Sequence, residues 1–284
     1  MESPDHLLAL NASEGAGLPA DWDSALDHAL KAAESGHGLS QASLAGLAGD
    51  WTLAHRLLEG EAMAASWRGL REKIDIGRWK RAPHPRMLSP SPRIGTVEQM
   101  VPPEVCDWLI ARARPGLIPA KVYDPGEGGP AFHKVRTNSE RFFPFPDRDL
   151  IFNLVRHRIA SITALAVNAM EAPTILHYEP GQQFEAHHDF LDPAAPGYAR
   201  TIQKQGQRVL TFLLCLNEDY EGGETDFPVL KRRFKGKKGT ALFFWNVSPE
   251  GIIDKSTMHA GLPPTKGKKW LLSQWIRDRK WPLL

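Results

Sequence analysis

The residues with the clearest chemical potential lie between Tyr178 and Asp189, in the sequence YEPGQQFEAHHD. Side chains two positions apart in an extended strand point to the same face, so His187 and Asp189 project together while His188 points away. An imidazole and a carboxylate on one face supply two of the three ligands of a 2-His-1-carboxylate Fe(II) site, which leaves positions open for substrate and oxygen. A His-x-Asp triplet is common, however, and by itself it also fits a hydrogen-bonded structural pair at a sheet edge.

A third ligand has to come from elsewhere in the chain, and His259 precedes a late apolar run of the β type. Further on, Lys269 lies inside the apolar segment KKWLLSQWI, where an unpaired buried ammonium would be costly. If this segment is a strand, Lys269 shares one face with Leu271, Ser273 and Trp275. An inward lysine opposite a metal suits a dicarboxylic acid that chelates the metal with its other end. The alternative is a lysine that reaches solvent from a strand end.

Six motifs follow one another in the order typical of a known family. They are VRTNS (135–139), YxxGQ…HxD (178–189), RxxT…LN (208–217), GGETxFP (222–228), GxALxF (239–244) and HAG…GxKW (259–270). On these motifs the region from about residue 96 to residue 284 resembles the Fe(II)- and 2-oxoglutarate-dependent dioxygenases of the prolyl 4-hydroxylase type. The first 90 residues carry none of them.

The resemblance implies a role for individual residues. The family's iron ligands correspond to His187, Asp189 and His259. Lys269 corresponds to the residue that binds the distal carboxylate of 2-oxoglutarate, and Tyr178 and Thr225 to positions that add hydrogen bonds to it. The implied reaction consumes O2 and 2-oxoglutarate, releases succinate and CO2, and hydroxylates an unactivated C–H bond, with ascorbate as a reductant.

The substrate that the resemblance implies first is a prolyl residue in a peptide or protein. Two alternatives stay open at this stage. One is hydroxylation of a free amino acid or a small peptide natural product. The other is a non-catalytic module that binds a peptide, which the presence of all three ligand residues and the lysine makes less favoured.

The implied fold is a mainly β double-stranded β-helix, or jelly roll, with flanking helices. The sequence supports this independently, because short β runs follow residue 172 with Gly, Pro and Asn between them and no long intervening helix. That pattern favours antiparallel pairing over βαβ units. The expected runs are 172–179, 208–216, 239–247 and 268–276, within a catalytic core of about 172–278.

The remaining elements predict an all-α extension before this domain. Apolar periodicity predicts helices over 21–35, 40–48 and 50–74, and further helices from about 102 to 113 and from Asp147 to Val167. The expected domains are a helical N-terminal extension (1–77), a basic linker rich in Pro and Ser (78–95) and an oxygenase domain (96–284). The extension is a candidate docking surface for the peptide or protein substrate.

Three further features bear on substrate and partner. Arg208 is a candidate for orienting a peptide, with a structural ion pair to Glu224 or Asp226 as the alternative, and Arg277 is a candidate substrate-facing residue. The segment between Asp189 and Arg208 is expected to be a mobile loop. Six basic side chains at 231–238 favour a solvated hairpin tip over a surface that binds an acidic partner.

Composition narrows the class of protein. The chain has 284 residues and a net charge of +2, so charge gives no reason to expect nucleic acid as a partner. Two cysteines, Cys106 and Cys215, exclude a disulfide scaffold and fit a reducing compartment. The first fifteen residues hold no long apolar run, and no stretch approaches a membrane span. We therefore expect a cytoplasmic protein that does not engage a membrane.

Overall fold

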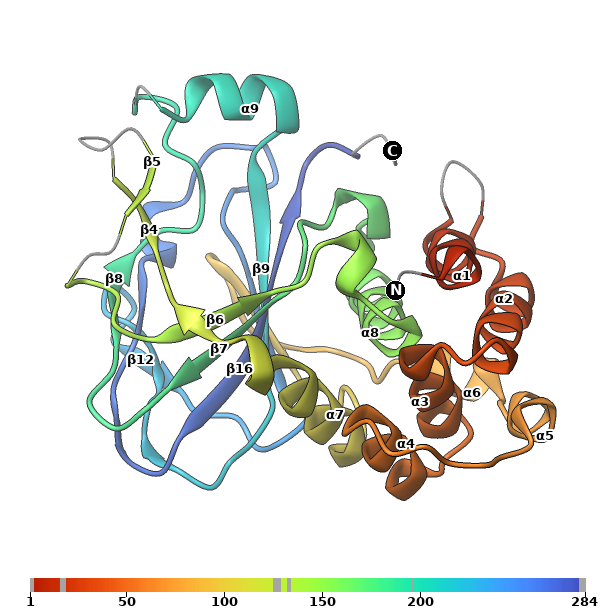
Figure 1. The fold of residues 1–284 in the computed structure, drawn as a ribbon. Helices are drawn as coiled ribbons and strands as arrows, with labels where there is room; N and C mark the ends of the chain where they lie inside the picture. Colours follow the sequence, from red (N-terminus) through yellow and green to blue (C-terminus); the bar gives the residue numbers. More distant parts are fainter. Residues whose placement is uncertain (1–2, 16–18, 125–128, 132–133, 196, 281–284) are drawn as a thin grey trace. The chain divides into compact units, whose positions relative to one another are not determined.

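The structure is a computed structural model that describes residues 3–15, 19–124, 129–131, 134–195 and 197–280 (Figure 1). Its residues form two compact units, which we describe separately. The first takes in the described residues of Met1–Ala82 and Phe143–Asn168, and the second those of Pro83–Phe142 and Ala169–Trp281. Each unit draws on two separate stretches of the chain.

The first unit is helical. Aspartates cap the N-termini of three of its helices, since Asp21, Asp50 and Asp75 each accept a hydrogen bond from the backbone N–H three residues on. Glycines in the left-handed region follow α2, α3 and α4, at φ values of 89°, 89° and 88°. The helices of the N-terminal stretch are α1 (Pro4–Glu14), α2 (Trp22–Glu34), α3 (Gly38–Leu47), α4 (Trp51–Leu58), α5 (Trp67–Glu72) and α6 (Ile76–Lys80).

The predicted helices over 21–35 and 40–48 are confirmed by α2 and α3. The single helix expected over 50–74 is wrong, because α4 ends at Leu58 and α5 begins at Trp67. Gly60 adopts a left-handed conformation that a continuous helix cannot contain, and it stops the helix there.

Another helix of this unit, α8 (Leu150–Thr163), comes from much later in the chain and packs against α1, α3 and α6. Buried polar contacts join it to α1: Glu14 forms ion pairs with Arg156 in α8 and with Arg148 just before it, and Asn153 Nδ2 donates a 2.8 Å hydrogen bond to Ser13 Oγ. The oxygenase range predicted from sequence, 96–284, therefore includes a segment that folds with the helical unit. Apolar periodicity locates α8 but does not say which neighbours cover it.

The N-cap of α8 gives a stability prediction. Asp149 is fully buried, and its carboxylate accepts hydrogen bonds of 2.9 and 3.0 Å from the backbone N–H groups of Ile151 and Phe152. Loss of such a cap costs about 1 kcal/mol. We expect Asp149→Ala to lower the midpoint of thermal unfolding by about 2–4 °C, measured by circular dichroism. Asp149→Asn, which can still accept these bonds, should restore most of the loss, and equal losses would contradict the capping role.

The second unit is built on an eight-stranded antiparallel sheet. Its central strands come from the four predicted β runs, which are confirmed. In spatial order the strands are β1 (Arg86–Pro90), β2 (Arg93–Val97), β13 (Ala241–Trp245), β9 (Arg208–Cys215), β16 (Lys269–Arg277), β7 (Thr174–Tyr178), β6 (Ser139–Phe142) and β3 (Ile118–Pro119). The helix α7 (Pro103–Ala113) also belongs to this unit.

A smaller sheet of four antiparallel strands accompanies it, in the order β12 (Arg232–Phe234), β11 (Thr225–Phe227), β14 (His259–Gly261) and β8 (Phe184–His187). A buried apolar cluster takes side chains from both sheets, with Phe227 from the smaller one and Leu213, Phe244 and Leu271 from the larger. Two short ribbons, β10 (Glu221–Gly222) with β15 (Pro264–Lys266) and β4 (Val122–Asp124) with β5 (Gly129–Ala131), complete the strands.

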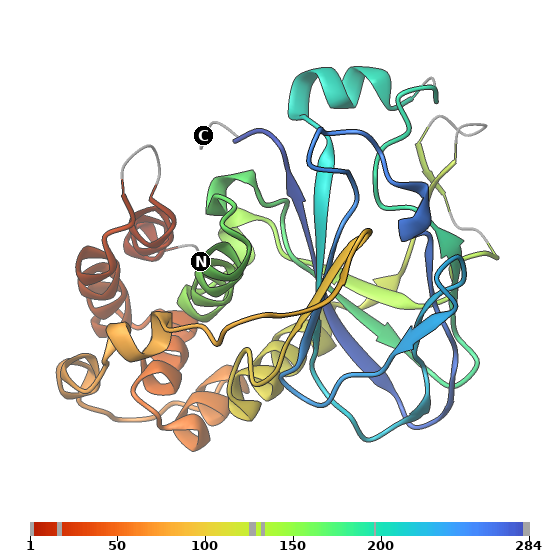
Figure 2. The same cartoon turned by 180° about the vertical axis from the view of Figure 1, so that it is seen from behind.

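The segment expected to be a linker, 78–95, is largely regular structure. After the end of α6, strands β1 and β2 form a hairpin that joins the large sheet through pairing of β2 with β13, and Figure 2 shows this hairpin from behind. Ile94 and Val97 are buried there. The basic and proline-rich composition hid the strands, because backbone pairing to a sheet edge needs only a few apolar residues.

Two predictions from composition can be compared with the structure. Cys106 and Cys215 are both buried free thiols, so no disulfide scaffold is present. Within the described ranges, no helix is long and apolar enough to cross a membrane.

Candidate active site

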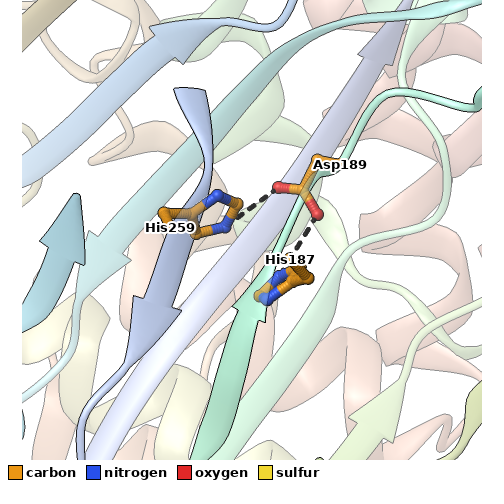
Figure 3. Close-up of side chains that lie close together, drawn as sticks. All are labelled: His187, Asp189 and His259. Carbon is orange, nitrogen blue, oxygen red and sulfur yellow. Dashed lines mark ion pairs between the residues drawn. The ribbon is translucent and has the colours of Figure 1, made fainter. Parts of the chain in front are cut away.

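Two histidines and one aspartate that are far apart in sequence meet in the second unit. His187 ends β8 and His259 begins β14, and the two are direct cross-strand neighbours. Asp189 lies two residues after His187, just beyond the end of β8. The Nε2 atoms of His187 and His259 lie 3.7 and 3.4 Å from the two carboxylate oxygens of Asp189 (Figure 3). One potential ligand atom from each residue lies within 4.8 Å of the others.

Both imidazoles are oriented by their backbone. Nδ1 of His187 lies 2.8 Å from the Glu185 carbonyl oxygen, and Nδ1 of His259 lies 3.1 Å from that of Thr257. A carbonyl can only accept, so Nδ1 carries the proton and Nε2 turns its lone pair toward Asp189. Burial lowers the pKa of His187 to about 3, with His259 as a further cause, and burial also lowers the pKa of His259. Both rings are therefore neutral at physiological pH, as metal binding requires.

The carboxylate of Asp189 is held in its charged form. Burial acts to raise its pKa, but a hydrogen bond from Thr211 and the positive charge of Arg208 act in the other direction, and the pKa lies below the usual value. The Thr211 hydroxyl donates to Asp189 Oδ2 over 2.7 Å, and Asn246 Nδ2 donates to Thr211 Oγ1 over 3.0 Å. Sequence reasoning gave neither residue a role, because nothing in their spacing relates them to Asp189.

Lys269 lines a pocket that His187, Asp189 and His259 also line, and it is only 2% exposed. Burial lowers the pKa of its ammonium to about 8, an effect that Cys215 and Glu224 partly offset. Its Nζ lies 5.0 Å from the ring centre of Tyr178. Among the described residues, no carboxylate forms an ion pair with it. Burial of an ammonium without a carboxylate partner is costly, and an anion bound beside it would offset that cost.

The pocket has a volume of about 860 Å³ and collects the residues that the sequence predicts as one site. The predicted face of β16 is confirmed, because Lys269, Leu271, Ser273 and Trp275 all line the pocket and the residues between them do not. The other predicted site residues on its wall are Tyr178, His187, Asp189, Arg208, Thr225, His259 and Arg277. A volume of this size exceeds what one small dicarboxylic acid fills.

His188 departs from the expectation that it points away, since it also lines the pocket. Its Nε2 lies 3.0 Å from the Lys255 carbonyl oxygen, and its ring packs 4.5 Å from that of Phe190. The strand ends at His187, so strict alternation no longer holds one residue later. His188 is nevertheless outside the group of three ligand atoms.

Arg208 and Arg277 share one carboxylate. Arg208 binds both oxygens of Glu171, through Nε at 2.7 Å and Nη2 at 2.9 Å, and Arg277 Nε lies 2.8 Å from Glu171 Oε1. The guanidinium of Arg208 also lies 3.5 Å from the ring centre of Trp275. The alternative of an ion pair between Arg208 and Glu224 or Asp226 is therefore wrong, because the partner is Glu171. Glu171 was missed, because it precedes β7 by three residues and shows no motif.

Two other segments carry features that bear on substrate and partner. The stretch after Asp189 contains a helix, α9 (Ala199–Gln205), where an aperiodic loop was expected. Tyr198 and Thr201 from this segment line the pocket. In the basic stretch 231–238, residues 232–234 form β12, Arg233 pairs with Asp226 and Lys238 with Asp107. Part of this charge is neutralised locally.

The chain is similar to known proteins in both sequence and structure. The 2OG-Fe(II) oxygenase superfamily matches residues 173–277. Prolyl 4-hydroxylase 1 from Arabidopsis thaliana is 32% identical over 260 residues, which cover 87% of each protein. Probable prolyl 4-hydroxylase 3 from the same plant is 32% identical over 67% of this chain and 71% of its own length. The crystal structure of a viral collagen prolyl hydroxylase from Paramecium bursaria Chlorella virus-1, a 2OG complex, has a TM-score of 0.50 and 29% identity, and it aligns with 66% of this chain and 96% of its own.

Proposed function

Since the chain belongs to the prolyl 4-hydroxylase type of 2OG-Fe(II) oxygenases, we propose that it hydroxylates prolyl residues in a peptide or protein. It is a dioxygenase that uses Fe(II), 2-oxoglutarate and O2. Bound together, these supply the oxidising chemistry that converts 2-oxoglutarate into succinate and CO2 and inserts oxygen into a C–H bond of the substrate. The chain itself supplies the ligands, an anion site and the pocket.

His187, Asp189 and His259 are the proposed iron ligands. Two neutral imidazoles, whose Nε2 lone pairs face the cluster, and one ionised carboxylate form the donor set that suits non-haem Fe(II). The two histidines come from paired strands, so the sheet fixes their separation, and Asp189 lies just beyond one of these strands. The donor types and their spacing therefore fit the metal.

Lys269 is the proposed anchor of 2-oxoglutarate, and this buried ammonium, which pairs with no carboxylate among the described residues, is the observation that carries the function. It shares the pocket with the three ligands, so a dicarboxylic acid can reach both ends of the site at once. Tyr178 and Thr225 are proposed to donate hydrogen bonds to the same distal carboxylate. Both are buried and line the pocket, and the high pKa of Tyr178, raised to about 12 by burial, keeps its hydroxyl protonated as a donor.

We propose that the two antiparallel sheets of the second unit form a double-stranded β-helix with the site between them. Phe227 and Leu213 support this, because they place side chains of both sheets in one apolar cluster. For the helical unit we propose a role in recruiting the substrate protein in the cytoplasm. The support is compositional, since its Ala-rich helices pair in succession as helical-repeat proteins do.

Arg208 and Arg277 are proposed to position the peptide. Arg208→Lys keeps the charge but loses the two-pronged grip on Glu171. We expect the KM for a proline-containing peptide to rise about two- to tenfold, corresponding to one hydrogen bond of about 0.5–1.5 kcal/mol. The KM for 2-oxoglutarate should stay constant, because Lys269 is untouched. Steady-state kinetics in each substrate separate the two, and an effect confined to 2-oxoglutarate would refute the assignment.

Iron-dependent formation of succinate tests the proposal as a whole. With Fe(II) and 2-oxoglutarate present, a proline-rich peptide should stimulate succinate release and gain 16 Da per hydroxylated residue. Free proline should have little effect, and its hydroxylation in preference to the peptide would favour the small-molecule alternative. Peptide binding without any turnover would identify a non-catalytic module.

A further inference from the structure

Asp189 has a hydrogen bond that the proposed ligand role does not use. Its Oδ2 accepts from the Thr211 hydroxyl, and Thr211 in turn accepts from Asn246, at the distances given above. Thr211 and Asn246 are both completely buried. We propose that Thr211 and Asn246 are positioning residues, which hold the Asp189 carboxylate in the orientation that binds iron. The inference rests on the proposed iron-binding role of Asp189.

The chemistry of the three groups fixes the direction of this chain of hydrogen bonds. An ionised carboxylate can only accept, so the single hydroxyl proton of Thr211 has to point at Asp189. The Thr211 oxygen then offers only lone pairs to its other neighbour, and the amide N–H of Asn246 is the matching donor. Asn246 Oδ1 has no hydrogen-bond partner among the described residues. If the Asn246 amide were turned over, its Oδ1 would face the Thr211 oxygen. The Thr211 hydroxyl would then have to donate to Asn246, and its hydrogen bond to Asp189 would be lost.

The backbones of Thr211 and Asn246 are held by hydrogen bonds to the large sheet, whereas Asp189 lies outside a strand. Thr211 lies in the middle of β9 and pairs with Phe244 on one side and Trp275 on the other. The backbone of Asn246 donates to Val209 over 2.8 Å and accepts from Asp254 over 2.9 Å. Neither residue can move without disturbing the large sheet.

Asp189, by contrast, is the one proposed ligand outside a strand. His187 and His259 belong to the paired strands β8 and β14, whereas Asp189 follows the end of β8. The terminal torsion of an aspartate side chain is soft, so an untethered carboxylate samples a broad range of rotations. The hydrogen bond from Thr211 therefore replaces the backbone pairing that the histidines have and Asp189 lacks.

Titration with Co(II) tests the positioning role of Thr211 and Asn246 through metal affinity and not through activity. Co(II) can replace Fe(II) in this test because it accepts the same nitrogen and oxygen ligands. Visible absorption of Co(II) would be followed in the full-length protein at saturating 2-oxoglutarate. Thr211→Val removes the hydroxyl but keeps the shape, and we expect the Kd for Co(II) to rise about 10- to 100-fold, the usual cost of losing a group that orients a metal ligand. Thr211→Ser should restore affinity close to that of the wild type. Asn246→Ala should weaken binding to an intermediate degree.

Controls separate this proposal from the one on which it rests. Thr96→Val removes another buried threonine hydroxyl from the large sheet, away from the pocket lining, and should leave the Kd unchanged. His187→Ala should abolish specific Co(II) binding, and unimpaired binding would overturn the iron site itself. If His187→Ala loses Co(II) while folded Thr211→Val and Asn246→Ala keep the wild-type Kd, the iron site stands and the positioning role is refuted. Equal losses in Thr211→Val and Thr211→Ser would also refute it, since the serine retains the donor.

Discussion

Replacement of His187, Asp189 or His259 by alanine is expected to abolish 2-oxoglutarate turnover in a protein that still folds. Each change removes one of three proposed iron ligands, and no fourth donor is present in the cluster formed by the described residues. Folding should survive the loss of either histidine, because both imidazoles are neutral and Asp189 keeps its hydrogen bond from Thr211. Folding should also survive Asp189→Ala, because that change removes a buried charge. Succinate formation measures the activity, and circular dichroism with thermal unfolding measures the fold.

His188→Ala is the matched control for this prediction. His188 lies beside the cluster and lines the same pocket, but its Nε2 is engaged by the Lys255 carbonyl. We expect this variant to retain most of its activity. An essential His188 combined with a dispensable His187 would show that the strand is shifted by one residue and would refute the ligand assignment.

Lys269→Ala is expected to weaken the binding of 2-oxoglutarate while leaving metal binding largely intact. A charge-assisted contact in a buried pocket contributes about 1.5–3 kcal/mol. That energy corresponds to a rise of about 10- to 100-fold in the apparent constant for 2-oxoglutarate. Titration of 2-oxoglutarate at saturating Fe(II) measures it. An unchanged constant would refute the anchor assignment and make Arg208 the next candidate.

Two neighbouring substitutions sharpen that result. Lys269→Arg should keep part of the function, since a guanidinium also binds a carboxylate but needs more room. Lys268→Ala should be nearly silent, because the Lys268 ammonium pairs with Glu179 over 2.8 Å at the surface and does not line the pocket. A loss of 2-oxoglutarate affinity in Lys268→Ala would place the anion elsewhere.

The low pKa of Lys269 also predicts a pH dependence. Below its pKa of about 8 the ammonium is protonated and can bind the distal carboxylate, and above it that charge is progressively lost. The apparent Kd for 2-oxoglutarate should therefore rise above pH 8, approaching tenfold per pH unit. In Lys269→Arg the rise should flatten, because a guanidinium keeps its proton throughout this range. Equal slopes in the two proteins would assign the titration to another group.

The sequence predicted the strands and the residues that meet at the site because both follow short-range rules. Alternation along an extended segment predicted His187 beside Asp189, although Asp189 lies just beyond the end of β8, and it predicted Lys269 on the pocket side of β16 together with Trp275. These relations need only the local geometry of one strand. The motif order then supplied His259, which no spacing rule connects to His187 although the two pair directly across strands.

What the sequence did not predict depends on neighbours distant along the chain. Glu171 is bound by Arg208 and Arg277 from two other strands, and Asn246 reaches Asp189 only through Thr211. Such contacts arise from the register of several strands at once, and a single sequence does not contain that register. The same holds for the β1–β2 hairpin, which is stabilised by the pairing of β2 with β13.

The position of α8 limits where this chain can be divided. It follows β6 and precedes β7, yet the helices that cover it are α1, α3 and α6. A shortened chain beginning after residue 82 would therefore retain α8 without those partners, and Arg148 and Arg156 would lose their ion pairs with Glu14. Deleting the N-terminal helices therefore differs from removing an independently folded domain that is joined by a flexible linker. Any recombination or trimming of this enzyme has to treat α8 and the first helices as one piece.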